Sequence, residues 1–265
     1  SALEYLEDIL INTTQLGLVN KECIVSCGHL FNKLLKKHKV NIFPLDSEHF
    51  SINNLENQKT NSLNNLYKIY LTASGGPLLN YNKRRMNNVS LKEVVNHPKW
   101  KMGYKNSIDS ATLANKCLEL IEAMYLFQVS MEDIDIVIHP EALIHSIIEY
   151  NNSTSIFNYF YNDMSIPIFH FMNYITNKKL KKMDKFKLNK NFNLNFIEVD
   201  KNKFPIYDIF KNIDYRLPQQ IIKFNVANQY AVELFKKDVI KYIQMPKIIE
   251  KSISYELKAS INSIG

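Results

Sequence analysis

The sequence predicts an α/β protein: an α+β domain with a mostly β sheet and flanking helices, followed by a small all-α C-terminal domain. Short apolar runs alternate with a segment of helical periodicity in residues 17–45. Apolar or alternating segments of strand length occupy much of residues 134–161. Three segments with helical spacing follow after residue 203, each with a proline at or near its start.

The expected elements follow this pattern along the chain. Strands are expected at residues 18–19, 40–45, 67–73, 134–138, 144–150 and 155–161. Helices are expected at residues 24–37, 110–127, 204–210, 218–236 and 246–260. An asparagine-rich polar stretch at 51–65 and a long loop at 78–105 are the main expected connections.

Composition excludes several classes of protein. Hydrophobic residues at 46% and charged residues at 22% are near globular averages, which excludes a wholly disordered or fibrous chain. Most of the net charge of +7 comes from scattered lysines. The densest lysine run, at 178–187, is interpreted as a solvated connector, because it lacks the interleaved aromatic residues and glycines of a single-strand binder. We therefore expect no nucleic-acid partner.

The same composition gives no sign of a membrane or of a structural metal. No apolar stretch approaches the roughly 20 residues that span a bilayer. The acidic start differs from a signal or transit peptide. The cysteines Cys23, Cys27 and Cys117 lack zinc-finger spacing, which favours ordinary buried thiols in a reducing compartment. We expect no membrane partner.

Carboxylates at two places predict a divalent-metal site. Asp46 and Glu48 end an apolar run, and in an extended chain their i, i+2 spacing puts both on one face. Glu119 belongs to the polar stripe of the helix expected from Ser110. Hard oxygen donors of this kind suit Mg²⁺ or Mn²⁺ and not zinc.

A phosphate site is expected beside these acids. Ser74-Gly75-Gly76-Pro77 follows an expected strand, and its glycines let backbone N–H groups converge on an anion. Ser110 is expected near a helix N-terminus, which favours anions, with Asn115 and Lys116 one turn later.

Three further residues each allow two interpretations. Trp100, in a long loop, is either a core anchor or a lid over a ligand. His139 and His145 follow an expected buried strand and are either core histidines or groups that reach a substrate. No G-x-G-x-x-G motif is present, so a complete dinucleotide-binding domain is not expected in these residues.

Taken in order, the motifs resemble the 1-deoxy-D-xylulose 5-phosphate reductoisomerases of the non-mevalonate isoprenoid pathway. The resemblance runs from about Val19 to the C-terminus. It rests on Asn20-Lys21-Glu22, Pro44-Leu45-Asp46-Ser47-Glu48-His49, Leu71-Thr72-Ala73-Ser74-Gly75-Gly76-Pro77, His97-Pro98-Lys99-Trp100-Lys101-Met102-Gly103, Asp109-Ser110-Ala111-Thr112, Asn115-Lys116, Glu119, Ile138-His139-Pro140 and Asp163-Met164.

The resemblance implies a role for each matching residue. The metal ligands are Asp46, Glu48 and Glu119. The substrate-binding residues are Ser47, Ser74, Trp100, Ser110, Asn115 and Lys116. The catalytic residues are Glu48, His97, Lys116 and His139. The cofactor-binding residues are Lys21, Glu22, Met102 and Gly103.

The resemblance also implies an activity and a division of the chain. The expected activity is the rearrangement of 1-deoxy-D-xylulose 5-phosphate and its reduction to 2-C-methyl-D-erythritol 4-phosphate, with NADPH and Mg²⁺ or Mn²⁺. A homodimer in the bacterial cytoplasm is expected, with a plastid stroma as the alternative location. The expected parts are a remnant of the NADPH-binding domain (1–44), the catalytic domain (45–177), a connector (178–200) and a helical C-terminal domain (201–265).

Two other hypotheses remain open from the sequence. Because most of the family's NADPH-binding domain has no counterpart here, the chain could instead be a non-catalytic remnant that binds a metal and a sugar phosphate. The weaker third hypothesis is a basic RNA-contacting module that uses the lysine run at 178–187.

Overall fold

The fold is taken from a computed structural model, which describes residues 2–56, 65–96, 102–177 and 193–255. His97, Trp100 and the lysine run at 178–187 lie outside the described residues. Within them, no helix combines the length and the apolar character that crossing a membrane requires.

The N-terminal part contains the expected strand, helix and strand. After the short helices η1 (Ala2–Tyr5) and α1 (Leu6–Ile11), β1 (Gln15–Leu18) and β2 (Asn41–Pro44) pair in parallel on either side of α2 (Lys21–His38). The Asn20 side chain caps α2 by accepting from the Cys23 N–H at 3.1 Å. A small apolar cluster that includes Leu10 and Phe31 holds α1 against α2.

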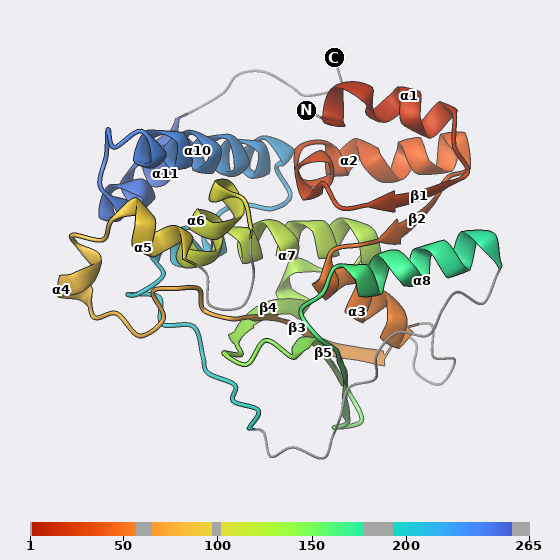
Figure 1. The fold of residues 1–265 in the computed structure, drawn as a ribbon. Coiled ribbons are helices and arrows are strands. Elements are labelled where there is room, and N and C mark those ends of the chain that lie inside the picture. The colour runs from red at the N-terminus through yellow and green to blue at the C-terminus, as the bar shows by residue number, and fades with distance from the viewer. Residues whose placement is uncertain (1, 57–64, 97–101, 178–192, 256–265) are drawn as a thin grey trace.

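The central sheet has four strands in the order β4-β3-β5-β6. Its strands are β3 (Leu66–Ala73), β4 (Ile134–Ile138), β5 (Ile144–Tyr150) and β6 (Ser155–Tyr159). The β3–β4 pair is parallel, whereas the other two pairs are antiparallel. The helices α3 (Ser47–Glu56) and α7 (Ala114–Phe127) lie above this sheet, and α2 and α10 lie beyond α7 (Figure 1).

Helices make up the C-terminal part, as the sequence predicts. They are α9 (Pro205–Lys211), α10 (Pro218–Lys236), η4 (Tyr242–Gln244) and α11 (Met245–Ser254). One apolar core joins them to the sheet, because buried residues such as Ile69, Leu120 and Phe224 belong to the same cluster. The predicted fold class is confirmed, while the bounds of the four expected parts stay a prediction.

Several expected local structures are corrected. Asp109-Ser110 does not begin a helix, because α6 (Tyr104–Thr112) already contains both residues and α7 begins only at Ala114. Leu113 separates the two helices in a left-handed conformation, with φ 62°. This interruption leaves no trace in the apolar periodicity, which continues through residue 113.

Two expected connections are partly helical, and several further helices were not expected. The helix α3 occupies residues up to Glu56 of the stretch read as polar and irregular. The short helices α4 (Lys83–Met86), α5 (Leu91–Val95) and η3 (Met131–Asp133) were also not expected. The helix α8 (Ser165–Thr176) runs alongside β1 and β2, where Phe171 contacts Phe43 with ring centroids 5.4 Å apart (Figure 1).

Candidate metal and phosphate site

One cavity of about 310 Å³ collects most of the predicted site residues. It lies where the start of α3, the end of β3 and the junction of α6 with α7 meet. The predicted residues that line it are Lys21, Asp46, Ser47, Glu48, Ser74, Met102, Ser110, Asn115, Lys116 and Glu119. Segments as far apart as residues 21 and 119 therefore build one site.

The three predicted metal ligands converge in this cavity. One carboxylate oxygen each from Asp46, Glu48 and Glu119 lies within 4.8 Å of the others. Their side chains are 12%, 13% and 2% exposed, respectively. This arrangement of hard oxygen donors fits a divalent cation such as Mg²⁺ or Mn²⁺.

The geometry that joins Asp46 to Glu48 differs from the expected extended chain. The strand β2 ends at Pro44, and Glu48 lies in the first turn of α3. The Phe50 N–H donates to the Asp46 carbonyl at 2.8 Å, which begins the helix at this point. A helical turn, and not a strand, therefore brings the two carboxylates together.

Two lysine ammonium groups lie against the same carboxylates. Lys21 Nζ is 2.7 Å from Asp46 Oδ2 and 2.8 Å from Glu119 Oε1. Lys116 Nζ is 2.8 Å from Glu48 Oε1 and 2.7 Å from Glu119 Oε2. The carboxylates thus face a common region that attracts positive charge.

These contacts determine the ionisation of the cluster. Burial by itself would raise the pKa of Glu48, but the Lys116 ammonium and the His145 imidazole together outweigh it and hold that pKa well below its usual range. Burial likewise opposes the charge on Lys116, yet Glu119 and Glu48 raise the pKa of its ammonium group. Glu48 is therefore an anion, ready to bind a cation.

The predicted phosphate residues Ser74, Ser110, Asn115 and Lys116 line the same cavity. Gly75 and Gly76 have φ of 80° and 67°, the left-handed region that favours glycine. The Gly76 N–H donates to Ser74 Oγ at 3.2 Å. A Cβ on Gly76 would lie 2.7 Å from the Ser110 carbonyl oxygen, so the turn packs directly on the end of α6.

The helix N-terminus at this cavity belongs to α7 and not to α6, the helix that contains Ser110. Ser110 is in the last turn of α6, which corrects the expectation that it lies near a helix N-terminus. Asn115 and Lys116 lie in the first turn of α7 and line the cavity. The N-terminus of a helix favours an anion, so the expected stabilisation of a phosphate comes from the first turn of α7.

The predicted cofactor residues do not share one place. Lys21 lies within the carboxylate cluster, and Met102 lines the cavity. Glu22 instead pairs with Lys105 at 2.9 Å. Gly103 precedes α6 as its N-cap, outside the cavity lining.

Of the two weighed histidines, His145 and not His139 lines the cavity. His145 Nδ1 lies 3.8 Å from Glu48 Oε1, and its ring stacks on Phe160 with centroids 4.1 Å apart. His139 is fully buried, with Nδ1 2.8 Å from the Asn195 carbonyl oxygen. The catalytic role of His139 stays a prediction, and the geometry favours His145.

Sequence reasoning missed other polar residues of the site. Thr72, Asn106 and Asn162 line the cavity, and no motif marked them as functional. Thr72 lies in β3, two residues before the predicted substrate-binding residue Ser74. This position near Ser74 is the feature of the sequence that could have indicated Thr72.

A buried histidine–glutamate pair adjoins the carboxylate cluster. His49 Nδ1 lies 3.3 Å from Glu122 Oε2. Burial raises the pKa of Glu122 to about 8, although His49 opposes this shift. Burial disfavours the charged form of His49, but Glu122, Asp46 and Glu119 together outweigh it and raise the pKa of the imidazole.

The fold and the site define an α/β protein whose carboxylate and lysine cavity is suited to a hard cation beside an anion. Two sequence models of one family match the chain. The 1-deoxy-D-xylulose 5-phosphate reductoisomerase C-terminal domain matches residues 42–127, and the DXP reductoisomerase C-terminal domain matches residues 161–264.

Named relatives agree with these matches. The 1-deoxy-D-xylulose 5-phosphate reductoisomerase of Clostridium kluyveri is 41% identical over 245 residues, which cover 90% of this chain and 61% of the relative. The reductoisomerase structure from Zymomonas mobilis, in complex with NADPH, has a TM-score of 0.87 at 30% identity and covers 99% of this chain and 67% of that chain.

A further solved structure is a DOX-P reductoisomerase in complex with NADPH, fosmidomycin and magnesium, with a TM-score of 0.80 at 33% identity. It covers 93% of this chain and 62% of that chain. The chain belongs to the 1-deoxy-D-xylulose 5-phosphate reductoisomerase family, as the motifs predict. It spans about 61% of the length of the curated relatives it matches.

Proposed function

We propose that the chain forms the metal- and substrate-binding part of a 1-deoxy-D-xylulose 5-phosphate reductoisomerase. The proposed reaction rearranges this sugar phosphate and reduces it to 2-C-methyl-D-erythritol 4-phosphate, with NADPH and Mg²⁺ or Mn²⁺. The observation that carries the proposal is the convergence of Asp46, Glu48 and Glu119 within 4.8 Å, in the same cavity as Ser74 and Asn115. A solved relative holds NADPH and magnesium, which supports both cofactors.

At the metal end, Asp46, Glu48 and Glu119 would hold the cation. When bound, the cation supplies Lewis-acid polarisation of the substrate's keto and hydroxyl oxygens. Ser47 Oγ donates to Glu48 Oε2 at 2.6 Å, which fixes that carboxylate and keeps the hydroxyl beside the reacting end. Substrate oxygens and waters would complete the coordination shell.

In the same cavity, Ser74, Ser110, Asn115 and Lys116 would bind the phosphate group, with Asn115 and Lys116 also in contact with Glu119. Their hydroxyl, amide and ammonium groups are the donors that a phosphate dianion accepts from. Binding energy at this remote group would orient the reacting carbons relative to the metal.

A direct assay tests the proposal. The chain is mixed with Mn²⁺, 1-deoxy-D-xylulose 5-phosphate and NADPH, and nicotinamide absorbance is followed with the Glu119→Gln variant as the control. Loss of absorbance that depends on Glu119 supports the activity. Substrate binding that is indifferent to Glu119→Gln contradicts the proposed site.

Calorimetry separates the enzyme from the alternative, a non-catalytic binding protein. The chain spans only about 61% of its relatives' length, so cofactor binding by this chain is a separate question. Binding of Mn²⁺ and sugar phosphate without NADPH would favour the alternative for the isolated chain. Binding of all three favours the enzyme.

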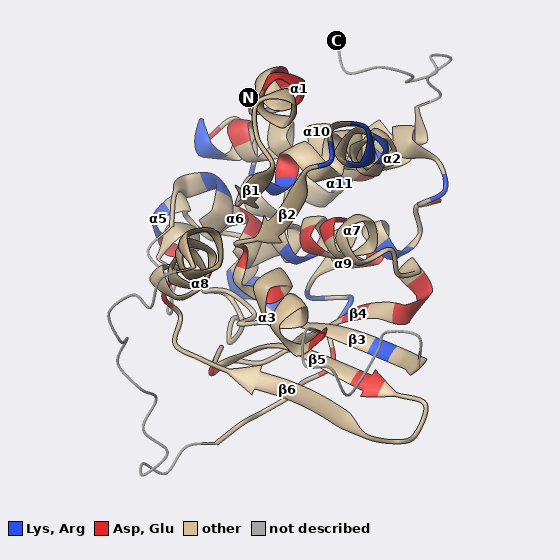
Figure 2. Ribbon diagram, turned by 90° about the vertical axis from the view of Figure 1, so that its right-hand side faces the viewer, with Lys and Arg blue, Asp and Glu red and all other residues tan. Residues whose placement is uncertain are grey.

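A homodimer remains part of the proposal, and exposed apolar side chains on two elements support it. The strand β6 is the last in the sheet order and lies at the sheet's edge (Figure 2). Large apolar side chains on β6 and α8 are exposed, among them Phe157, Ile168 and Tyr174 at 44%, 44% and 57%. Exposed apolar side chains of this kind mark protein interfaces, and sedimentation velocity of the chain tests for a dimer.

The named relatives are bacterial, which supports a bacterial cytoplasmic location.

A further inference from the structure

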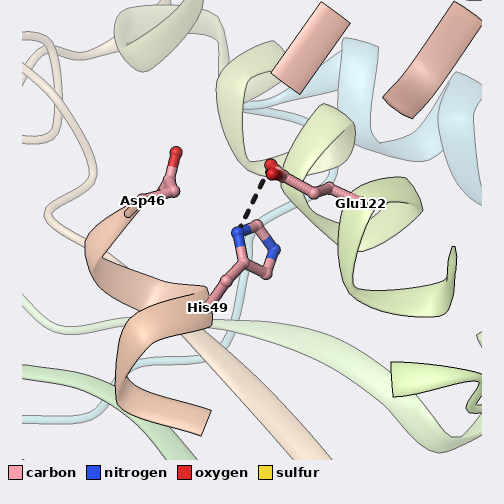
Figure 3. Close-up of side chains that lie close together, drawn as sticks. All are labelled: Asp46, His49 and Glu122. Carbon is pink, nitrogen blue, oxygen red and sulfur yellow. Dashed lines mark ion pairs between the residues drawn. The ribbon is translucent and has the colours of Figure 1, made fainter. Parts of the chain in front are cut away.

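A buried brace connects the two helices that carry the proposed metal ligands. His49 is on α3, next to Glu48, and is fully buried. Its Nε2 lies 2.9 Å from the backbone carbonyl oxygen of Glu119 on α7. Its Nδ1 faces Glu122, one turn further along α7, at 3.3 Å (Figure 3).

This connection bears directly on the distance between two metal ligands. Glu48 and Glu119 come from separate helices, so the gap between their carboxylates depends on how α3 packs against α7. The neighbour of the first ligand is hydrogen-bonded to the backbone of the second. A change in this bond is therefore expected to change the geometry of the cation site.

The orientation of the imidazole is fixed by its partners. A carbonyl oxygen only accepts hydrogen bonds, so Nε2 carries the hydrogen and donates it. The ring also stacks on Phe127 with centroids 6.3 Å apart. Glu122 is 1% exposed and, within the described residues, its two oxygens have no hydrogen-bond donor, which leaves His49 as its nearest polar contact.

We propose that His49 is a positioning residue that sets the separation of Glu48 and Glu119, and thereby the affinity of the site for its cation, with Glu122 as the neighbour of its Nδ1. The inference rests on the proposed cation site. Neither His49 nor Glu122 lines the cavity that the three ligands share, so neither is proposed as a ligand of this cation. Partners that orient metal ligands typically change metal affinity 10- to 100-fold when they are replaced.

A direct coordination role is the competing explanation. Single ligand atoms of Asp46, His49 and Glu122 also lie within 4.8 Å of one another (Figure 3). If this group held a second cation, Glu122 would be a ligand and two ions would bind per chain. The experiment must therefore separate orientation from coordination.

Mn²⁺ titration calorimetry on the full chain makes this separation with paired variants. Glutamine at position 49 places an amide nitrogen near Nε2 and keeps the bond to Glu119, whereas asparagine places its amide near Nδ1 and loses that bond. We expect His49→Asn to weaken Mn²⁺ binding about 10- to 100-fold, and His49→Gln to recover most of this loss. Glu122→Gln should stay close to wild type, since its amide still reaches the imidazole.

The controls identify which idea fails. Ser51→Ala alters another buried residue of α3, which bonds Ser146 of β5 at 2.7 Å, so it should reduce thermal stability and leave Mn²⁺ affinity unchanged. Equal losses for His49→Asn and His49→Gln, a loss in Glu122→Gln as large as in Glu119→Gln, or two Mn²⁺ ions per chain would overturn the inference alone. A wild-type chain that binds no Mn²⁺ would instead overturn the proposed function.

Discussion

Lys116 occupies two predicted roles at once. Its ammonium group pairs with Glu48 and Glu119, while its place in the first turn of α7 puts it beside the expected phosphate. A cation in the carboxylate cluster would compete with the ammonium for the same oxygens. If the cation displaced it, Lys116 would become available to the anion, so we expect metal and phosphate binding to support each other at this side chain.

This double role gives the Lys116→Ala variant two opposite effects. Removal of a charge-assisted contact weakens binding of the sugar phosphate by about 1.5–3 kcal/mol. Removal of a neighbouring positive charge favours the cation, so Mn²⁺ affinity rises. Calorimetry with each ligand alone measures both effects. Weaker binding of both ligands would contradict the competition between Lys116 and the cation.

Residue types could be predicted at this scale more reliably than residue geometry. Carboxylates and lysines carry their chemistry in their identity, so Asp46, Glu119 and Lys116 were recognised from sequence. Whether His139 or His145 faces the cavity depends on how β4 and β5 are placed, which no local pattern encodes. His97 and Trp100 lie outside the described residues, and their roles stay predictions.

At the scale of elements, the Ser-Gly-Gly-Pro turn is held against α6 by the lack of a side chain on Gly76. A Cβ there would meet backbone atoms, the Ser110 oxygen at 2.7 Å and the Ala111 Cα at 2.9 Å. A Cβ on Gly75 would meet only the end of the Leu79 side chain, at 2.7 Å. Both glycines therefore have a φ that would strain any other residue. They differ in the atoms that would have to move if a side chain were added.

The matched variants Gly76→Ala and Gly75→Ala test this difference. Each costs about 1–3 kcal/mol of stability for a left-handed alanine. Gly76→Ala adds a backbone clash that pushes Ser74 away from Ser110, so it should also weaken sugar-phosphate binding. Thermal melts and calorimetry measure the two effects. Equal phosphate affinities in both variants would contradict the role of this close packing.

The contact between β4 and α9 depends on pH. The Tyr207 hydroxyl donates to Asp135 Oδ1 at 2.6 Å, and Lys211 Nζ donates to Oδ2 at 3.2 Å. Burial would raise the pKa of Asp135, but these donors outweigh it and lower that pKa. A lowered carboxyl pKa gives stability that is present above the unfolded value, near pH 3.9, and is lost as the pH falls through the folded value.

Tyr207→Phe should therefore destabilise the chain by about 1.5–3 kcal/mol at pH 7. The difference from wild type should shrink as the pH falls from 5 toward 3. Urea unfolding at several pH values measures it. Tyr215→Phe is the control, because Tyr215 donates to the uncharged Phe210 carbonyl and its effect should not change with pH. A Tyr207→Phe effect that is independent of pH would contradict the charged contact.

Helices and strands could be predicted where the periodic pattern of apolar residues is unbroken. They were missed where the chain changes direction locally. The strands β4 and β5 follow a clear apolar pattern, and both were placed from sequence. The junction at Leu113 was missed because a left-handed leucine is uncommon and its cost is offset by burial at 2% exposure. The helix α8 was missed because its apolar residues extend around it, and several of them stay exposed.

At the scale of the whole molecule, α7 connects the cation site to both apolar clusters. Its polar face carries Lys116 and Glu119, and its buried residues Leu120 and Ile121 belong to the larger core. Tyr125, near its end, packs against both clusters. The site is thus built on a helix that is packed on several sides, which keeps its carboxylates in place.

The continuous core predicts that the helical C-terminal part and the sheet unfold together, although the sequence divides them at residue 201. Phe224 on α10 is fully buried, and its ring centroid is 5.2 Å from that of Phe210 within the core that also contains Ile69 of β3.

Phe224→Ala should cost about 3–5 kcal/mol of folding stability. If the core is one cooperative unit, amide hydrogen exchange should lose equal protection in β3 and α10. Phe31→Ala, in the separate N-terminal cluster, is the matched control and should lower protection mainly in residues 6–44. A loss confined to α10 and α11 after Phe224→Ala would show instead that the C-terminal helices form an independent folding unit.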